Sequence, residues 1–290
     1  MSGRRGIGRI RRLGQAVLTR PLSVATEKGA IALNKSSGRP PRFFFSALLD
    51  DLAGALQFLT ILPLGPSDRF DPRRVMRFFP VAGIVIGSLV SAFDALATLV
   101  LPLPVAAALD VALLALVTGA LHLDGLADTA DGLLGPHDRT RALAIMKDSR
   151  VGAMGVVTVA LVLIVKTVAL GAVSDHRTLA LILVPAFARS AMMVAMAVMP
   201  YARKGGGTGR AFFHPPARAV DLAAIALPLG LSVFLGWRCI VIITVFAAVT
   251  ILMLQFYRRR MGGVTGDLIG ALGEVVEAAL WVALVAGVAS

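Results

Sequence analysis

Long apolar runs are the feature of this chain that most restricts its fold. Of its 290 residues, 57% are hydrophobic and only 16% are charged, whereas about a quarter of the residues of a typical soluble domain are charged. The apolar residues are grouped into stretches of about 20, which is the length that a helix needs to cross a bilayer. A crossing segment must satisfy its own backbone polar groups, so the sequence predicts an all-α, polytopic helical membrane protein.

Seven of these stretches are long enough to be transmembrane helices. They are 78–101, 103–123, 154–173, 179–199, 220–236, 239–256 and 268–288. The run before them, 43–64, carries Asp50 and Asp51 near its middle, where charge is costly inside a bilayer. We therefore expect about seven transmembrane helices plus an interfacial N-terminal helix, in a single membrane-embedded catalytic domain of residues 43–290.

Basic residues in the short loops predict the orientation of these helices. If 43–64 does not cross, four polar loops lie on one side and carry fifteen Lys or Arg residues. These loops are 63–77, 124–153, 200–219 and 257–267. The opposite loops carry only Arg177 and Arg238. Because cytoplasmic loops are enriched in Lys and Arg, the four polar loops are expected to face the cytoplasm.

Residues 1–42 have a different composition, with ten Lys or Arg residues and a single acid, Glu27. They are rich in Gly, Ser and Pro and show no sustained apolar period. We interpret this segment as a basic, disordered extension that lies on an anionic leaflet of membrane lipids. The alternatives are a transit peptide, which such an Arg-rich leader resembles, and a translation start further downstream.

The sequence HLDGLADTADG, at 122–132, places Asp124, Asp128 and Asp131 at spacings of four and three. On a helix these side chains lie within about 60° of one another, on one face. Like charges on one face repel, and a bound divalent cation offsets that repulsion. Carboxylate oxygens suit Mg²⁺, which usually also keeps waters and substrate phosphates. The motif therefore predicts a magnesium site; the alternative is a solvated acidic end of a membrane helix.

Three other polar segments are expected on the same side of the membrane; all three carry charge, and two of them are also rich in glycine. They are MKDSR at 146–150, YARKGGGTGR at 201–210 and GGVTGDLIGALGEVVE at 262–277. Glycine-rich turns free backbone N–H groups for anions, and Lys or Arg adds the charge. Acids for a metal and bases for phosphates, on one membrane face, indicate transfer of a phosphoryl-linked group.

Acidic residues also occur in the last predicted helix. Asp267 opens that helix and can cap it. Glu274 and Glu277 lie about two and three turns deeper, among apolar residues, where an ionised carboxylate is expensive. We expect the helix to line the cavity that holds the three aspartates, with Glu274 or Glu277 facing these aspartates or their basic neighbours. The alternative is that both glutamates pair with an intramembrane cation, for which Lys166 and Arg189 are candidates.

Two other residue types are less informative. His122 is the first residue of the acidic motif. We interpret it as a general base or, alternatively, as a structural hydrogen-bonding partner. The single cysteine, Cys239, excludes a disulfide within the chain, and the four histidines show no zinc-type spacing.

The acidic motif, followed by R-x-L-x-IMKDSR-x-G-x-x-G from Arg141, resembles the cobalamin synthases, which are adenosylcobinamide-GDP ribazoletransferases. The likeness runs from about residue 49 to the C-terminus. Its other motifs are FLTILP at 58–63, FFPVAGIVIG at 78–87, YAR at 201–203 and GGVTGDLIGA at 262–271. The loop KGGGTG after Arg203 is richer in glycine than the family pattern.

The resemblance implies a Mg²⁺-dependent, phosphotransferase-type enzyme of the bacterial inner membrane. It would join α-ribazole, or its 5′-phosphate, to adenosylcobinamide-GDP, giving adenosylcobalamin, or its phosphate, and GMP. Expected partners are these substrates, membrane lipids and enzymes of the same pathway on the cytoplasmic face, but no nucleic acid. Our hypothesis is that the three aspartates hold the metal and that one of them, or Asp148, accepts the hydroxyl proton. Lys147, Arg150 and Arg203 would neutralise the phosphates.

Two alternatives remain at this stage. CDP-alcohol phosphotransferases share a D-x-x-D-G fragment, which residues 128–132 match, but the rest of their pattern does not follow here. A cation transporter would need a relay of charged residues inside the membrane. The sequence has no evident internal repeat, and its charge is concentrated in loops, which argues against a transporter. The relay residues would be Asp94, Lys166, Arg189, Glu274 and Glu277.

Overall fold

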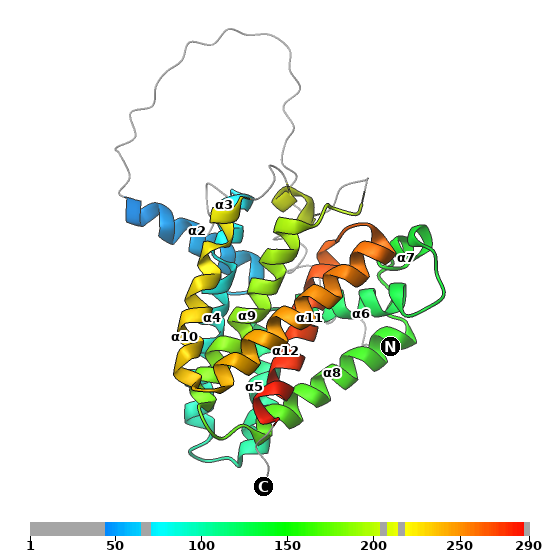
Figure 1. Cartoon of the computed structure of the whole chain (residues 1–290). Coiled ribbons are helices and arrows are strands. Elements are labelled where there is room, and N and C mark those ends of the chain that lie inside the picture. Colours follow the sequence, from blue (N-terminus) through cyan, green and yellow to red (C-terminus); the bar gives the residue numbers. More distant parts are fainter. Residues whose placement is uncertain (1–43, 65–70, 204–207, 214–217, 287–290) are drawn as a thin grey trace, which may run out of the picture. The chain divides into compact units, whose positions relative to one another are not determined.

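The computed structural model describes residues 44–64, 71–203, 208–213 and 218–286, and these residues form helices (Figure 1). The long elements are α2 (Phe44–Leu59), α4 (Phe79–Ala97), α5 (Leu103–Val117), α6 (Leu121–Leu133), α8 (Ala153–Ala172), α9 (Arg177–Val198), α11 (Arg238–Met261) and α12 (Gly266–Val285). The short ones are α3 (Pro72–Arg77), α7 (Arg139–Ile145), η1 (Thr208–Phe213), η2 (Ala219–Ile225), α10 (Ala226–Ser232) and η3 (Val233–Leu235). The prediction of an all-helical membrane domain is confirmed, while the predicted extension 1–42 lies outside the described residues.

Fewer helices qualify as membrane spans than the sequence predicted. Among the described residues, five are long and apolar enough to cross, namely α4, α8, α9, α11 and α12, and a sixth span is counted if α5 and α6 are taken together. The predicted span 220–236 is instead divided among η2, α10 and η3, a shorter apolar stretch. With only 16 residues, α2 is not among the spans.

The predicted span 103–123 is broken into two helices, α5 and α6, whose axes differ by 89°. Gly119 and Ala120 connect them with φ values of 60° and 55°, in the left-handed region. Ile61, in the loop after α2, donates its backbone N–H to the Val117 carbonyl at 2.9 Å. A Cβ on Gly119 would lie 2.5 Å from the Ile61 side chain, so this corner requires glycine. The bend gives the acidic motif a helix of its own.

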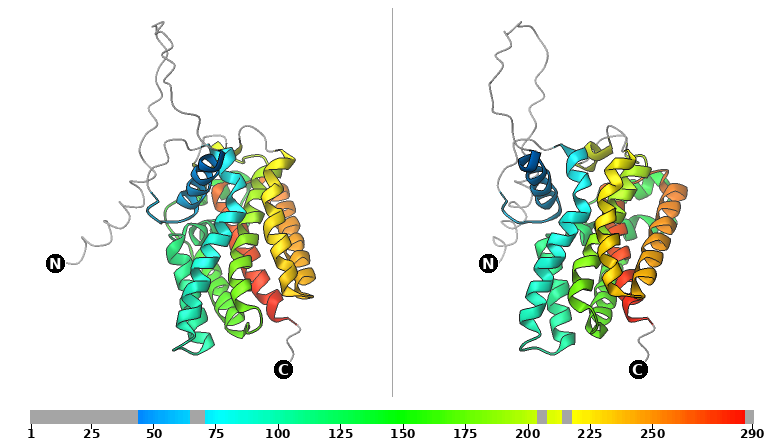
Figure 2. Two further views of the ribbon diagram at one scale, coloured as in Figure 1. Left: turned by 90° about the vertical axis from the view of Figure 1, so that its left-hand side faces the viewer. Right: turned by 60° about the vertical axis from the view of Figure 1, so that its left-hand side comes forward.

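Buried packing is concentrated on α9 and α12, which contact each other and most of the remaining long helices (Figure 2). In α4, Gly83 and Gly87 lie directly against the backbone of α9, where a Cβ would come within 2.6 Å and 2.5 Å of backbone atoms. By contrast, α8 and α11 are mostly exposed and carry large apolar side chains outward, such as Ile164 and Leu252. These outward faces suit a lipid environment.

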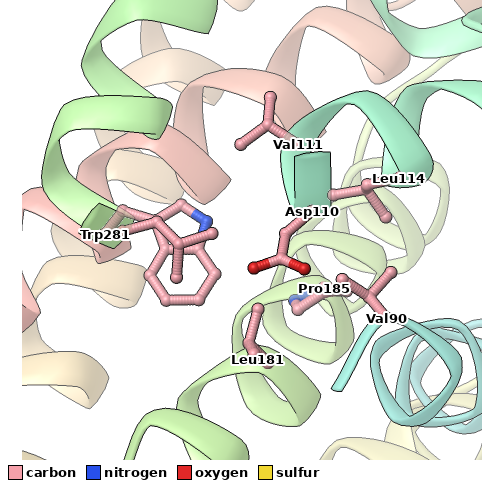
Figure 3. Close-up of a pocket in the computed structure, with 8 residues that line it drawn as sticks. Val90, Asp110, Val111, Leu114, Leu181, Pro185 and Trp281 are labelled. Atoms are coloured by element: carbon pink, nitrogen blue, oxygen red, sulfur yellow. The ribbon is translucent and has the colours of Figure 1, made fainter. Parts of the chain in front are cut away.

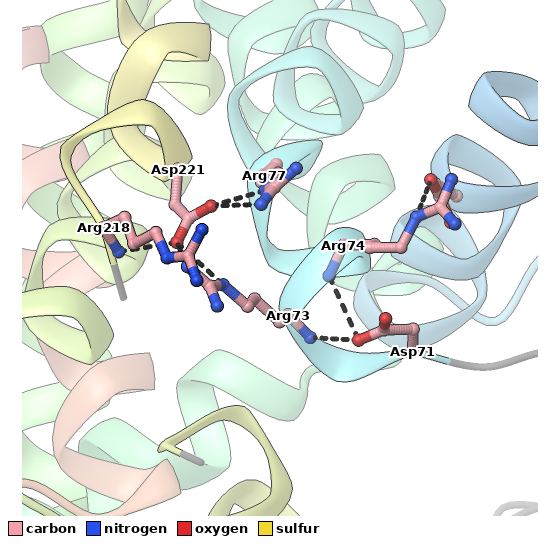
Figure 4. Close-up of polar contacts among 7 residues, drawn as sticks. Asp71, Arg73, Arg74, Arg77, Arg218 and Asp221 are labelled. Atoms are coloured by element: carbon pink, nitrogen blue, oxygen red, sulfur yellow. Dashed lines mark hydrogen bonds and ion pairs between the residues drawn. The ribbon is translucent and has the colours of Figure 1, made fainter. Parts of the chain in front are cut away.

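An arginine cluster on α3 joins three elements at one end of the bundle (Figure 4). Arg73 and Arg77 donate to the two carboxylate oxygens of Asp221 in η2, and Arg74 donates to Asp51 in α2 at 2.9 Å. Burial raises the pKa of Asp221, but the backbone N–H of Arg218 and the two guanidiniums outweigh burial, so the pKa lies below its ordinary value. The ion pair with Arg74 offsets the cost of placing the Asp51 carboxylate in an apolar helix.

A second buried ion network joins α4, α5 and α9. Arg177 at the start of α9 donates to Asp94 at 2.8 and 3.0 Å, to Asp110 at 3.1 Å, and to the carbonyl of Leu170. The second oxygen of Asp110 has no hydrogen-bond partner among the described residues. Figure 3 shows the Asp110 carboxylate directed into a small cavity of about 10 Å³ beside Trp281. This volume is about the minimum that a single water molecule requires.

Candidate functional site

The acidic motif forms α6, which begins immediately after the left-handed Ala120. Asp124 is exposed and Asp128 is partly buried. Within the described part of the chain, no hydrogen bond or ion pair satisfies either carboxylate. Most apolar and glycine residues of α6 face the bundle instead, including Gly125, Leu126 and Ala130. The helix thus presents two carboxyl groups that have no partner among the described residues.

Glycine at position 125 brings α6 against the beginning of α12. A Cβ there would lie 2.9 Å from the carbonyl oxygen of Asp267 and 3.0 Å from its Cα, so a larger residue would separate the two helices. One turn further, the backbone of His122 lies against Gly270. Close helix contact therefore places Asp267, the first acid of α12, beside the carboxylates of α6.

Arg203 is the cation of this region and is bonded to Asp267, with 2.7 Å between its Nη2 and the carboxylate. Two backbone hydrogen bonds of 2.9 Å join the segments that precede these two residues: Ala202 donates to Val264, and Val264 donates to Pro200. Asp128 lies within electrostatic range of Asp124, Asp267, Asp131 and Arg203. Three further carboxylates and one guanidinium thus lie close enough to Asp128 to influence its charge.

Asp131 lies on α6 as predicted but has a different contact. One carboxylate oxygen accepts the backbone N–H of Gly152 at 2.6 Å, and the other accepts that of Gly155 at 2.8 Å. These N–H groups belong to the N-terminal end of α8, where the helix leaves its own donors unpaired. Asp131 therefore caps α8. Among the described residues, no group of three or more His, Cys, Asp or Glu side chains is arranged to hold a metal ion.

The MKDSR segment places its charged residues at the surface. Lys147 is exposed, and Arg150, which is 87% exposed, forms a bidentate pair with Asp148. The hydrogen bonds from the Arg150 side chain and backbone hold the pKa of Asp148 below its usual value. A carboxylate with a lowered pKa is a weak proton acceptor. Asp148 is thus less suited to the role of general base than the sequence suggested.

Glu274 and Glu277 form buried ion pairs, as the alternative interpretation of the sequence predicted. Lys166 of α8 contacts Glu274 at 2.5 Å and Glu277 at 3.0 Å, and Arg189 of α9 contacts Glu277 at 2.9 Å. All four side chains are buried, and their formal charges cancel. The expectation that one of the glutamates faces the acidic motif or its basic neighbours is therefore not met, because both already have cations inside the bundle.

His122 is a buried neighbour of this network rather than a surface base. It is 3% exposed, lies within electrostatic range of Arg189, Glu277 and Lys166, and its Nε2 has no hydrogen-bond partner among the described residues. A general base must reach the proton that it removes. The burial of His122 argues against the role of general base, and its Nε2, unpartnered within the part of the chain that the structure describes, does not support the alternative role of hydrogen-bonding partner either.

Arg139, at the start of α7, is a residue of this region that the sequence did not single out. Its Nε donates to the carbonyl of Met261 at 2.7 Å, and its Nη2 donates to the carbonyl of Ala202 at 2.8 Å. Both acceptors are main-chain atoms that lie far from Arg139 in the sequence, so no pattern of side chains predicts the contact. The basic residue in a short helix directly after the acidic motif was the only available signal.

Comparison with known proteins places these residues in a family context. The family model for cobalamin-5-phosphate synthase matches residues 51–285. The adenosylcobinamide-GDP ribazoletransferase of Geotalea daltonii is 42% identical over 243 residues, which cover 80% of this chain and 95% of that protein. The enzymes of the same name from Pseudomonas savastanoi and Syntrophobacter fumaroxidans are each 41% identical, covering 79% and 78% of this chain and 96% and 94% of theirs. No solved structure is significantly similar.

Proposed function

We propose an adenosylcobinamide-GDP ribazoletransferase activity in cobalamin synthesis for this chain, which belongs to the cobalamin-5-phosphate synthase family. The reaction joins α-ribazole, or its 5′-phosphate, to adenosylcobinamide-GDP. It releases GMP and leaves adenosylcobalamin, or its 5′-phosphate. The support is the similarity to named relatives along most of their length, together with a site that is chemically suited to a diphosphate.

The observation that carries this proposal is the pair of unpaired carboxylates, Asp124 and Asp128, beside the Arg203–Asp267 ion pair. In the proposed step, the ribazole 3′-hydroxyl oxygen bonds to the phosphorus that is attached to cobinamide. The bond from that phosphorus to the bridging oxygen breaks, and GMP leaves with the electron pair. The hydroxyl proton passes to a carboxylate of α6, because the hydrogen bonds from Arg150 lower the pKa of Asp148 and make it the weaker base.

The donor set fits Mg²⁺, which usually takes one or two carboxylates and completes its shell with water and substrate phosphate. Asp124 and Asp128 meet this requirement, since their oxygens are not committed to residues in the described part of the chain. Asp131 would orient the site through α8, because both of its oxygens already accept N–H groups. When bound, Mg²⁺ supplies charge neutralisation to a diphosphate and its leaving oxygen.

Arg203 has the geometry to bind the substrate phosphates. Its Nη2 is bonded to Asp267, and its side chain remains about one-fifth exposed, at 22%. A guanidinium offers several donors in one plane and matches phosphate oxygens in pairs. Lys147 and Arg150 are exposed on the neighbouring segment and stay candidates for the same task.

We also propose that the site faces the cytoplasm from the bacterial inner membrane. The segments that carry Asp124, Arg203 and Asp267 belong to the loops with the fifteen basic residues. Their enrichment in Lys and Arg supports a cytoplasmic position. Soluble nucleotide substrates would then reach the site directly, and GMP would leave to the same compartment.

The deciding experiment uses the purified full-length protein in lipid nanodiscs with adenosylcobinamide-GDP, α-ribazole and Mg²⁺. GMP release should appear together with an equal amount of adenosylcobalamin, and the rate should fall to background when Mg²⁺ is removed by a chelator and return when it is added back. A parallel reaction without α-ribazole is the control for simple hydrolysis. Absence of GMP release with verified substrates would refute the assignment.

A further inference from the structure

Arg139 connects two separate segments that border the site. Through Nε it binds the carbonyl of Met261, the last residue of α11, at 2.7 Å. Through Nη2 it binds the carbonyl of Ala202 at 2.8 Å. Ala202 directly precedes Arg203, and Met261 begins the turn that leads to Asp267. A single side chain therefore binds the backbone directly before Arg203 and the end of the helix from which the turn to Asp267 begins.

The two segments have few other bonds to each other. Gly262 turns the chain after α11 with φ of 64°, and Val264 then exchanges hydrogen bonds with Pro200 and Ala202. These two bonds set the register of the two segments. Arg139 adds one hydrogen bond to each segment, to Met261 in one and to Ala202 in the other. Its planar guanidinium holds both carbonyls at once, which the single ammonium of a lysine does not reproduce.

The position of α7, and hence of Arg139, depends on α6. Asp138 caps α7 by accepting the Arg141 backbone N–H at 2.7 Å. Met146, at the other end of α7, packs against Gly132 of α6, where a Cβ would lie 2.9 Å from the Met146 side chain. Arg139 thus relates the helix that carries Asp124 and Asp128 to the segments that carry Arg203 and Asp267.

We propose that Arg139 is a positioning residue for the transferase reaction, and that it acts by holding Arg203 and Asp267 in place against the carboxylates of α6. This inference rests on the proposed function. A purely structural role is the competing explanation, because a basic side chain at the carbonyl end of α11 stabilises that helix end in any case. The two roles differ in whether the effect of Arg139 on catalysis depends on Arg203.

A double-mutant cycle separates them. We expect Arg139→Gln to lower kcat/KM about ten- to a hundredfold, since a misplaced binding group is costly, and Arg139→Lys to lower it less. In an Arg203→Lys background, which keeps the charge but loses the fork, the same Arg139→Gln change should lower kcat/KM by less than about twofold. Arg259→Gln, which removes an exposed arginine from the same end of α11, is the control and should leave kcat/KM unchanged. An equal loss in both backgrounds would overturn the proposal.

Hydrogen exchange provides a readout that does not depend on turnover. In Arg139→Gln, the amides of Ala202 and Val264 should exchange faster, while those of α4 and α9 keep their wild-type rates. Unchanged exchange at Ala202 and Val264 would show that Arg139 does not hold these segments and would also overturn the inference. If the wild-type protein released no GMP, the proposed function would fail, whereas this exchange measurement would still test the positioning.

Discussion

Asp124 and Asp128 of α6 and Glu274 and Glu277 of α12 carry the same chemical group in opposite situations. Glu274 and Glu277 are buried in the bundle, and Lys166 and Arg189 neutralise them within hydrogen-bonding distance. Asp124 and Asp128 lie at the accessible end of the molecule, without an ion pair to any residue that the structure describes. Charges that the fold balances internally contribute to holding helices together, whereas unbalanced charges are free to bind a cation or substrate.

Glu277→Gln should have the largest effect, and it should appear in stability. The substitution removes the partner of Arg189 and one partner of Lys166, which leaves buried positive charge uncompensated and costs about 3–5 kcal/mol. Unfolding in detergent, followed by helical circular dichroism, measures this loss. The Mg²⁺ concentration for half-maximal activity should stay at its wild-type value in the protein that remains folded. A raised Mg²⁺ requirement at wild-type stability would instead assign Glu277 to the catalytic lining.

Asp128→Asn tests the other side of the comparison. The change should lower the rate of GMP release about 10²- to 10³-fold, because it removes a charge at which the site collects cations. Stability should be unchanged or slightly higher, since repulsion from Asp124 one turn away is relieved. The matched control is Asp175→Asn, an exposed aspartate with only a long contact to Arg238, and it should leave both quantities unaltered. Full activity in Asp128→Asn would remove the basis of the metal assignment.

Much of this contrast could be read from the sequence, and the reason is energetic. An acid inside an apolar helix must find a cation or water, so the sequence offered Lys166 and Arg189 as partners of Glu274 and Glu277, although as the alternative to the expected lining of the acidic cavity. The same argument missed the network around Arg177. That residue follows a short loop and was counted as a loop charge, whereas it turns inward to Asp94 and Asp110.

The break between α5 and α6 shows what apolar runs do not reveal. Residues 103–123 are long enough to form one straight helix, and hydrophobicity alone gives no reason to stop it. The bend depends on left-handed conformations at Gly119 and Ala120 and on contact with Ile61, from a distant part of the sequence. Asp131 is a similar case, because the helical spacing correctly placed it on α6, but the N–H groups that it binds belong to α8.

The Arg177 network offers a smaller test, because two carboxylates share one cation. Asp94 accepts three of the four hydrogen bonds that Arg177 makes to them, and Asp110 accepts one. Asp94→Asn should therefore cost about 1.5–3 kcal/mol, the usual range for hydrogen bonds to charged groups, and Asp110→Asn clearly less. Chemical unfolding of both variants measures the difference. Equal losses would mean that Arg177 distributes its interaction evenly between the two aspartates.

The smallest expected effect is the contribution of Asp221 to the dependence of stability on pH. Its pKa is lowered in the folded protein by the backbone N–H of Arg218 and by Arg73 and Arg77, which outweigh the effect of burial. A group whose pKa is depressed on folding stabilises the native state above its unfolded pKa, about 3.9 for Asp. This contribution is lost as the pH falls through the lower, folded value. The stability difference between wild type and Asp221→Asn should thus be constant from about pH 5 to 7 and should shrink below about pH 4. Unfolding measured across this range tests the sign, and a difference that grows on acidification would show that the arginine cluster does not hold Asp221 ionised.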